Sequence, residues 1–407
     1  LVRCLQEKLL AVVPQPLRIA EGLACPDAQQ YVVRVRVRLA QVGADYFLTA
    51  APNASAFDPV AIASLAPTLW YQSADEVFAQ TDQPAVTVGT SFWGQAYYSQ
   101  DKYGERHDHA VIGGTSFDVN NRIDTKRMGL QGGVDYGFGG ARVGLTGGYG
   151  QAKADNDLNN RIKATGWNVG AYGQFGGYTG FHGAGLVKYD RYKLRFDSGA
   201  FNGDHSRLTA LGVDGSLGYR FGIGAAATLD AKAGLSHVRS KVDDINAFGF
   251  NYDIGRVTST RGRAGLRATF GNGFAPYVDA TVYREFNGRR NVALFDGLNS
   301  YDLGSNGKGT WARLEAGISS NGGPGPLVAA WADLGDKKGF GIRAGFRFGG
   351  RAMAEVIAPP PPPAAPIAPP PATQTCSDGS VILATDLCPV LAPPPAPPAP
   401  EAQPERG

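Results

Sequence analysis

Between about residues 90 and 350, apolar and polar side chains alternate, and this pattern restricts the fold more than any other feature. From Leu211 to Phe221 most odd positions are apolar, while Asp214, Ser216 and Arg220 stand between them. A period of two is that of a β-strand, whose side chains point alternately to two faces. Twelve such runs occur, near 90–101, 126–137, 141–152, 163–175, 180–194, 206–221, 225–239, 257–270, 274–286, 309–319, 327–334 and 339–348.

Glycine supports the same interpretation. Of the 56 glycines, 51 lie between residues 90 and 350. This excludes a helical bundle, because each interior glycine costs a helix about 1 kcal/mol relative to alanine, and it argues against a doubly wound α/β enzyme for the same reason. The net charge of +3 gives no sign of a nucleic-acid partner. No stretch of eighteen apolar residues predicts a transmembrane helix.

The connections between the runs differ in length in a regular way. Short glycine-rich links lie at 139–140, 176–177, 222–224, 271–273 and 321–325, and long polar ones at 102–125, 153–162, 195–205, 240–256 and 287–308. Short turns on one rim and long loops on the other are typical of outer-membrane barrels. We therefore expect an all-β fold, a 12-stranded antiparallel transmembrane β-barrel. An even strand number places both barrel ends on the short-turn side.

In such a barrel the polar faces of the strands line the lumen. The predicted lumen-lining residues are Asp214, Asp230, Arg261, Arg263, Arg267, Arg313, Glu315, Arg343 and Arg347. In a soluble sandwich the same faces would meet bulk water, and a period of two does not distinguish the two arrangements.

The segments on either side of the runs have different patterns. Residues 58–81 have helical spacing, with Pro67 expected to break or kink the helix. Residues 31–39 and 45–49 have the pattern of strands. Seventeen of the 27 prolines lie in the last fifty residues, which predicts a disordered, extended tail. Within it we expect a disulfide between Cys376 and Cys388. The chain starts at Leu1 without a recognisable signal peptide, so we expect a processed or partial product.

Several segments together resemble the β-domain of autotransporters, the type V secretion systems of Gram-negative bacteria. These are GGVDYGFGGARVGLTGGYGQ (132–151), GWNVGAYGQFGGYTGFHGAGLVKYDRY (166–192), APYVDATVYREF (275–286) and the closing FGIRAGFRF (340–348). The resemblance implies a passenger remnant, the end of a β-helix, at 1–57 and a linker helix threading the pore at 58–88. It further implies the barrel at 89–350, closed by Phe346 and Phe348, and a Pro-rich periplasmic tail at 351–407.

The function implied is that of an outer-membrane translocator that exports its passenger and anchors it at the cell surface. The implied partners are the lipid bilayer, the barrel-assembly machinery, periplasmic chaperones and the chain's own passenger, around a monomeric barrel. No pattern predicts catalytic, cofactor-binding or metal-binding residues, so we expect no enzyme activity. A porin-like or structural barrel anchored toward the cell wall is the alternative. The helix at 58–81 separates the two, because a plain porin has no need of it.

Overall fold

The computed structural model describes residues 35–42, 45–52, 58–103, 107–112, 115–120, 122–156, 161–197, 203–224, 227–247, 250–271, 274–295, 300–352 and 372–390. The chain divides into two compact units, Leu1–Met353 and Ala354–Gly407. Each unit is described by itself.

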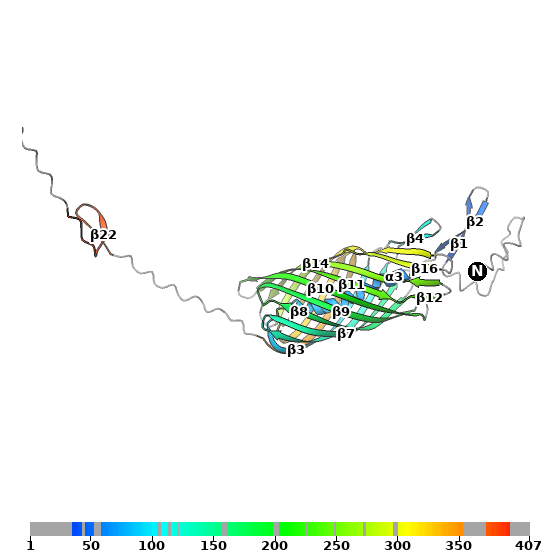
Figure 1. Cartoon of the computed structure of the whole chain (residues 1–407), viewed down its shortest axis with the longest axis horizontal. Coiled ribbons are helices and arrows are strands. Elements are labelled where there is room, and N and C mark those ends of the chain that lie inside the picture. Colours follow the sequence, from blue (N-terminus) through cyan, green and yellow to red (C-terminus); the bar gives the residue numbers. More distant parts are fainter. Residues whose placement is uncertain are drawn as a thin grey trace, which may run out of the picture. The chain divides into compact units, whose positions relative to one another are not determined.

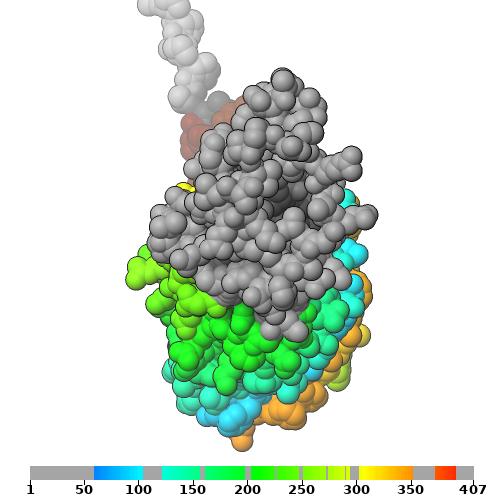
Figure 2. Space-filling view, turned by 90° about the vertical axis from the view of Figure 1, so that its right-hand side faces the viewer, coloured from blue at the N-terminus to red at the C-terminus, as the bar shows by residue number. Residues whose placement is uncertain are grey.

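Twelve antiparallel strands of the first unit close into a barrel, which confirms the predicted fold (Figure 1). The first and last of them pair along their length, with Tyr103 opposite Lys337 and Phe92 opposite Phe348. Blue atoms of the first strand adjoin orange atoms of the last strand at the bottom edge of the view in Figure 2. The strands are β3 (Thr87–Tyr103), β6 (Ile123–Phe138), β7 (Ala141–Asn156), β8 (Arg161–Phe175), β9 (Gly180–Phe196), β10 (His205–Ile223), β11 (Ala227–Val242), β14 (Arg256–Phe270), β15 (Ala275–Glu285), β18 (Gly309–Ser319), β19 (Gly325–Gly335) and β20 (Lys337–Ala352).

The short turns lie where glycine was abundant. Gly139, between β6 and β7, has a φ of 77°, a left-handed conformation that glycine adopts without steric cost. Its backbone N–H donates to the carbonyl of Thr87 at 3.1 Å, which joins the turn to the start of β3. These turns keep consecutive strands antiparallel and adjacent.

The apolar face of the wall points outward and the polar face inward. Leu130, Leu145 and Leu217 are more than 60% exposed, whereas Asp230, Arg261 and Arg343 are less than 5% exposed. A protein folded in water buries its apolar side chains, so the reversed order requires an apolar solvent around the barrel. The soluble sandwich is therefore excluded.

A second sheet is built from the long connections. It has six strands in the order β12-β13-β16-β17-β4-β5. The sequence showed these connections only as long polar loops. The strands are β4 (His107–Ile112), β5 (Thr115–Asn120), β12 (Ile245–Ala247), β13 (Phe250–Asp253), β16 (Arg289–Phe295) and β17 (Ser300–Asn306). We call this the loop sheet.

The helix α3 (Asp58–Thr81) lies inside the barrel (Figure 1). It continues through Pro67, so the expected break is wrong. An interior proline removes one backbone hydrogen bond, and packing on all sides outweighs that loss. From Pro59 to Thr81 every residue except Thr68 is buried. In the part of the chain that the structure describes, no helix is both long and apolar enough to cross a membrane.

Ahead of the helix, β1 (Val35–Val42) and β2 (Asp45–Pro52) form an antiparallel hairpin. Residues 31–34, where the first of these strands was expected to begin, lie outside the described residues, as do 1–30, 43–44 and 53–57.

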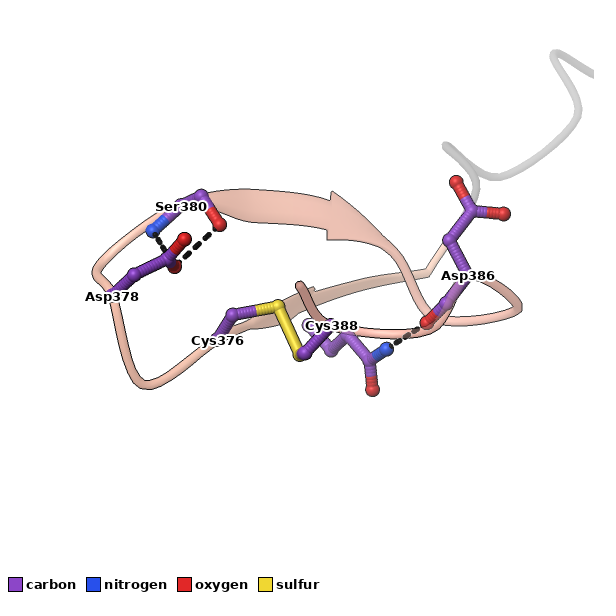
Figure 3. Close-up of a disulfide and its surroundings, with 6 residues drawn as sticks. Cys376, Asp378, Ser380, Asp386 and Cys388 are labelled. Atoms are coloured by element: carbon purple, nitrogen blue, oxygen red, sulfur yellow. Dashed lines mark hydrogen bonds between the residues drawn. A yellow bond between two sulfur atoms is a disulfide. The ribbon is translucent and has the colours of Figure 1, made fainter. Parts of the chain in front are cut away.

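The second unit holds a small hairpin of β21 (Thr373–Thr375) and β22 (Val381–Leu383). A disulfide joins Cys376 and Cys388, with 5.6 Å between their Cα atoms (Figure 3). In the turn, the Ser380 hydroxyl and its backbone N–H both donate to the Asp378 carboxylate, and they lower the pKa of that carboxyl. The expectation of an unfolded tail therefore does not extend to 372–390. Residues 353–371 and 391–407 are outside the described part.

Candidate functional site: the helix-filled lumen

The lumen wall carries charged side chains because alternate residues of each strand point inward. Arg261, Arg263 and Arg267 lie an even number of residues apart on β14, so all three face the same way. On the neighbouring strand Lys232 does the same. Such charges avoid a large desolvation cost only when each has a partner.

The acidic pair Asp75–Glu76 of α3 faces the most basic part of this wall. The Asp75 carboxylate accepts from Arg261 at 2.6 Å and from Arg313 at 3.1 Å. The Glu76 carboxylate accepts from the amide of Gln95 at 2.8 Å and lies 3.7 Å from the Arg343 guanidinium. The helix is thus joined to the wall through β3, β14, β18 and β20.

On another side of the helix, Trp70 and Ser73 face β9. The Trp70 indole donates to the backbone carbonyl of Lys188 at 2.9 Å, and the Lys188 ammonium lies 4.8 Å from the indole centre. That ammonium donates to the Ser73 hydroxyl at 2.7 Å and also pairs with Asp190. Every group of this buried set therefore has a partner.

Aromatic side chains of the helix stack against arginines. The guanidinium of Arg261 lies 4.0 Å from the centre of the Tyr71 ring, and that of Arg263 lies 4.1 Å from Phe78. The Tyr71 hydroxyl also lies 2.8 Å from the hydroxyl of Ser259. Stacking lets the helix bury apolar rings against charged groups that keep their ion pairs.

The residues after the helix lie at the short-turn rim. Asp82 pairs with Lys232 at 2.6 Å. Gln83 accepts a hydrogen bond from the backbone N–H of Gly322, in one short turn. The backbone N–H of Ala85 donates to Gly176, in another. The C-terminal end of α3 is therefore fastened where the chain enters β3.

The N-terminal half of α3 lies at the opposite, long-loop rim. Its apolar residues Val60, Ile62 and Leu65 belong to one buried cluster with loop-sheet residues. The loop-sheet members of that cluster are Ile245, Tyr252, Val292 and Leu303. The N-terminal end of α3 therefore lies at the long-loop mouth.

The cavities described beside the helix are small. Two cavities between α3 and the wall, one beside Gln72 and the other beside Phe78, each hold about 40 Å³. Such volumes hold a few water molecules and no further segment of chain. Among the described residues, no group of three His, Cys, Asp or Glu side chains is placed to hold a metal ion.

The comparisons with known proteins agree with this geometry. The family model for the autotransporter beta-domain matches residues 92–325, more than half of the chain. This chain belongs to the autotransporter β-domain family. It is an outer-membrane translocator, which exports a passenger.

The autotransporter β-domain also resembles solved barrels. The translocator domain of autotransporter NalP from Neisseria meningitidis shares its fold, with 16% identity, a TM-score of 0.51, and coverage of 71% of this chain and 97% of that one. The beta domain of the Bordetella autotransporter BrkA matches with 20% identity and a TM-score of 0.48, over 64% of this chain and 99% of that one. No curated protein matches the sequence.

The predicted lumen-lining residues of this β-domain all face inward, with pairs that cross between strands. Arg263 binds Asp214, Arg343 binds Glu315 at 2.9 Å, and Arg220 binds Asp230 at 3.2 Å. The others are Arg261 and Arg313 on Asp75, Arg347 on Asp135 and Arg267 stacked on Tyr277. Phe346 and Phe348 lie on the outer face of β20, 41% and 59% exposed.

The sequence missed the helix side of the network and the Lys188–Asp190 pair. On β9, charged residues occupy both faces, Lys188 and Asp190 inside and Arg191 and Lys193 outside. On this strand, the alternation of apolar and polar residues therefore did not indicate which side chains face the lumen and which face the lipid. The available signal for Asp75 and Glu76 was that they are the only charged residues of the helix after Asp58.

Proposed function

We propose that α3 is the trailing end of an exported passenger, held in the pore through which that passenger left. The single observation that supports this most is the match between helix and wall, in which Asp75 and Glu76 find partners on four different strands. A water-filled porin would present those charges to solvent.

In this proposal each of the four segments of the chain has its own role. Residues 1–57 are the remnant of the passenger, 58–88 the linker in the pore, 89–350 the translocator and 351–407 a periplasmic tail. The N-terminal end of α3 lies at the long-loop rim, which supports a cell-surface position for the passenger and the long loops. Because the strand number is even, the tail follows β20 on the same side as the start of β3, the periplasmic side.

Ion conductance in planar bilayers tests the filled pore. Deleting Asp58–Thr81 removes the helix and opens the lumen, so we expect a several-fold rise in single-channel conductance over the full chain. Deleting residues 372–390 is the matched control, because it removes a folded segment of similar length and leaves the lumen filled. Equal conductance of the full chain and the helix-deleted chain would refute the occupied pore.

Epitope tags on whole cells test the topology. A tag ahead of residue 58 should bind antibody on intact cells, and a tag at the C-terminus should bind only after the outer membrane is permeabilised. Antibody binding to the C-terminal tag on intact cells would overturn the periplasmic tail and would leave the filled pore unaffected.

Assembly of the barrel completes the proposal. The outward aromatic rings of Phe346 and Phe348 on the last strand, 4.5 Å apart between centroids, offer a signal to the barrel-assembly machinery. Periplasmic chaperones would carry the unfolded chain to that machinery. We propose that the barrel is monomeric, because one chain closes its own sheet and fills its own lumen. We also propose that its role is translocation and not catalysis.

A further inference from the structure

The outer wall carries a cluster of positive charge at the long-loop rim. On β9, β10, β11 and β14 the side chains that point outward near this rim include six cations, all exposed: Arg191, Lys193, Arg207, Arg239, Lys241 and Arg256. We call these six the rim cations. They point away from the lumen that α3 fills.

Strand register places the rim cations side by side. Lys193 is directly opposite Arg207. Lys241 is directly opposite Arg256, and Arg239 lies two residues from Lys241 on the same face. Outward neighbours on paired strands have Cβ atoms about 5 Å apart, so like charges here repel and destabilise the folded barrel unless an anion joins them.

No acidic side chain on these four strands offsets that charge. Their acidic residues are Asp190, Asp214 and Asp230, and all three are buried in the lumen. Arg195, farther along β9, does have a partner, because Asp197 pairs with it at 2.9 Å. Within the described residues none of the six rim cations lies within ion-pair distance of a carboxylate, although Asp243 and Asp244 are exposed just past β11.

The residues around the rim cations indicate which kind of anion would bind them. Toward the middle of the wall, beyond Tyr189, Thr209 and His237, the outward residues Val187, Leu211 and Leu235 are apolar and about half exposed. Trp167 lies directly opposite Arg191 and contacts Tyr189, with ring centroids 6.0 Å apart. Aromatic rings at this level mark the boundary between hydrocarbon and headgroups. We therefore infer that the anion is the headgroup of a lipid whose acyl chains lie against the apolar outer residues toward the middle of the barrel.

We propose that the rim cations bind the phosphate groups of an outer-leaflet glycolipid. Four of the six are arginines, whose planar guanidinium pairs with phosphate through two parallel hydrogen bonds. The outer leaflet of a Gram-negative outer membrane consists of phosphorylated glycolipid, and the long-loop rim faces that leaflet in the orientation proposed above. The bound lipid would fix the depth and tilt of the barrel on the β9–β14 side.

Lipid binding to the purified full chain in detergent micelles tests this site. The probe is lipopolysaccharide, compared with the same preparation after enzymatic removal of its phosphates. The variant R191Q/K193Q/R239Q/K241Q should bind the phosphorylated lipid about tenfold more weakly than the unaltered chain. The unaltered chain should lose similar affinity for the dephosphorylated lipid.

A matched control removes the same amount of charge elsewhere on the rim. Lys102, Arg161, Lys163 and Arg195 each already pair with a carboxylate, so K102Q/R161Q/K163Q/R195Q should keep most of the affinity. Heat-modifiable migration in detergent gels shows that each variant is folded. Equal loss in the control variant, or equal binding of phosphatidylglycerol micelles, would overturn a specific site.

A second measurement needs no variant. Because binding of exposed cations to phosphate is screened by salt, raising the ionic strength should bring the unaltered chain to the affinity of the rim variant. Binding that is insensitive to salt would refute the phosphate contacts. Both measurements are independent of conductance, so failure of the filled-pore proposal would leave this result interpretable.

Discussion

Asp75 is the residue on which the arginines of the lumen converge. Its carboxylate binds Arg261 and Arg313, and its backbone carbonyl accepts from Arg343 at 3.3 Å. Arg313 also forms a two-bond pair with Asp333, at 2.8 Å and 3.1 Å. A buried carboxylate at this position therefore compensates charge from two strands at once. Its removal leaves the buried Arg261 without its carboxylate partner, while Arg313 keeps Asp333.

Replacing Asp75 with alanine should lower the free energy of unfolding by about 3 kcal/mol, the usual cost of leaving a buried charge unpaired. The measurement is urea unfolding of the barrel in lipid vesicles, followed by tryptophan fluorescence.

The control for Asp75→Ala is Ser64→Ala on the same helix. The Ser64 hydroxyl is buried and has no hydrogen-bond partner among the described residues, so this change should not lower the free energy of unfolding. If both variants unfolded at the same urea concentration, the ion pairs of Asp75 would not stabilise the seated helix.

At the scale of elements, one contact shows how closely the helix and the wall fit. Gly212 of β10 points inward beneath the Trp70 indole, and a Cβ added there would overlap the indole ring. The absence of a side chain therefore admits Trp70, the largest fully buried side chain among the described residues. Composition showed that glycine was abundant in the strands, but only the seated helix shows why this position requires it.

Gly212→Leu should unseat the helix and raise the single-channel conductance of the full chain. The added side chain occupies the volume of the Trp70 ring, and overpacking of this kind typically costs 1–3 kcal/mol or more.

Gly215→Leu is the matched control, three residues along the same strand. Gly215 points outward, and a Cβ there would meet no atom within 4 Å. The conductance of the Gly215→Leu variant should therefore equal that of the unaltered chain. Equal conductance of the two variants would show that the Trp70 contact does not hold the helix in place.

At the scale of the whole molecule, the two compact units should respond separately to chemical change. The barrel closes on itself through the pairing of β3 with β20, and its stability comes from that closed ladder and its filled lumen. The hairpin of residues 372–390 is too short for a core of its own, since chains of this size depend on disulfides or metals.

Reducing the Cys376–Cys388 disulfide should therefore unfold only the second unit. Closing a loop with a sequence separation of 12 contributes about 3 kcal/mol to stability, which is comparable to the whole free energy of unfolding of such a hairpin. Limited proteolysis with proteinase K should then cut between 372 and 390, while the urea midpoint of the barrel stays the same. A shifted barrel midpoint would show that the two units are coupled.

The ends of the strands were only partly predictable. The run at 309–319 agrees with β18, while β20 extends to Lys337 and Ala352, beyond the predicted 339–348. Polar residues at the rims interrupt the apolar alternation before the hydrogen-bonded ladder ends, so the pattern underestimates strand length. The loop sheet escaped prediction for a related reason, because its short strands pair across connections far apart in sequence.

The sequence by itself determined the number of barrel strands, the short turns, the inward set of arginines and the two cysteines near enough in the chain to pair. These are local properties, since side-chain parity and turn chemistry act over a few residues. Only the tertiary structure decided what the arginines face. Asp75 meets Arg261 and Arg313, which lie 186 and 238 residues away. That contact exists because the sheet closes around the helix, and no period in the sequence encodes the closure.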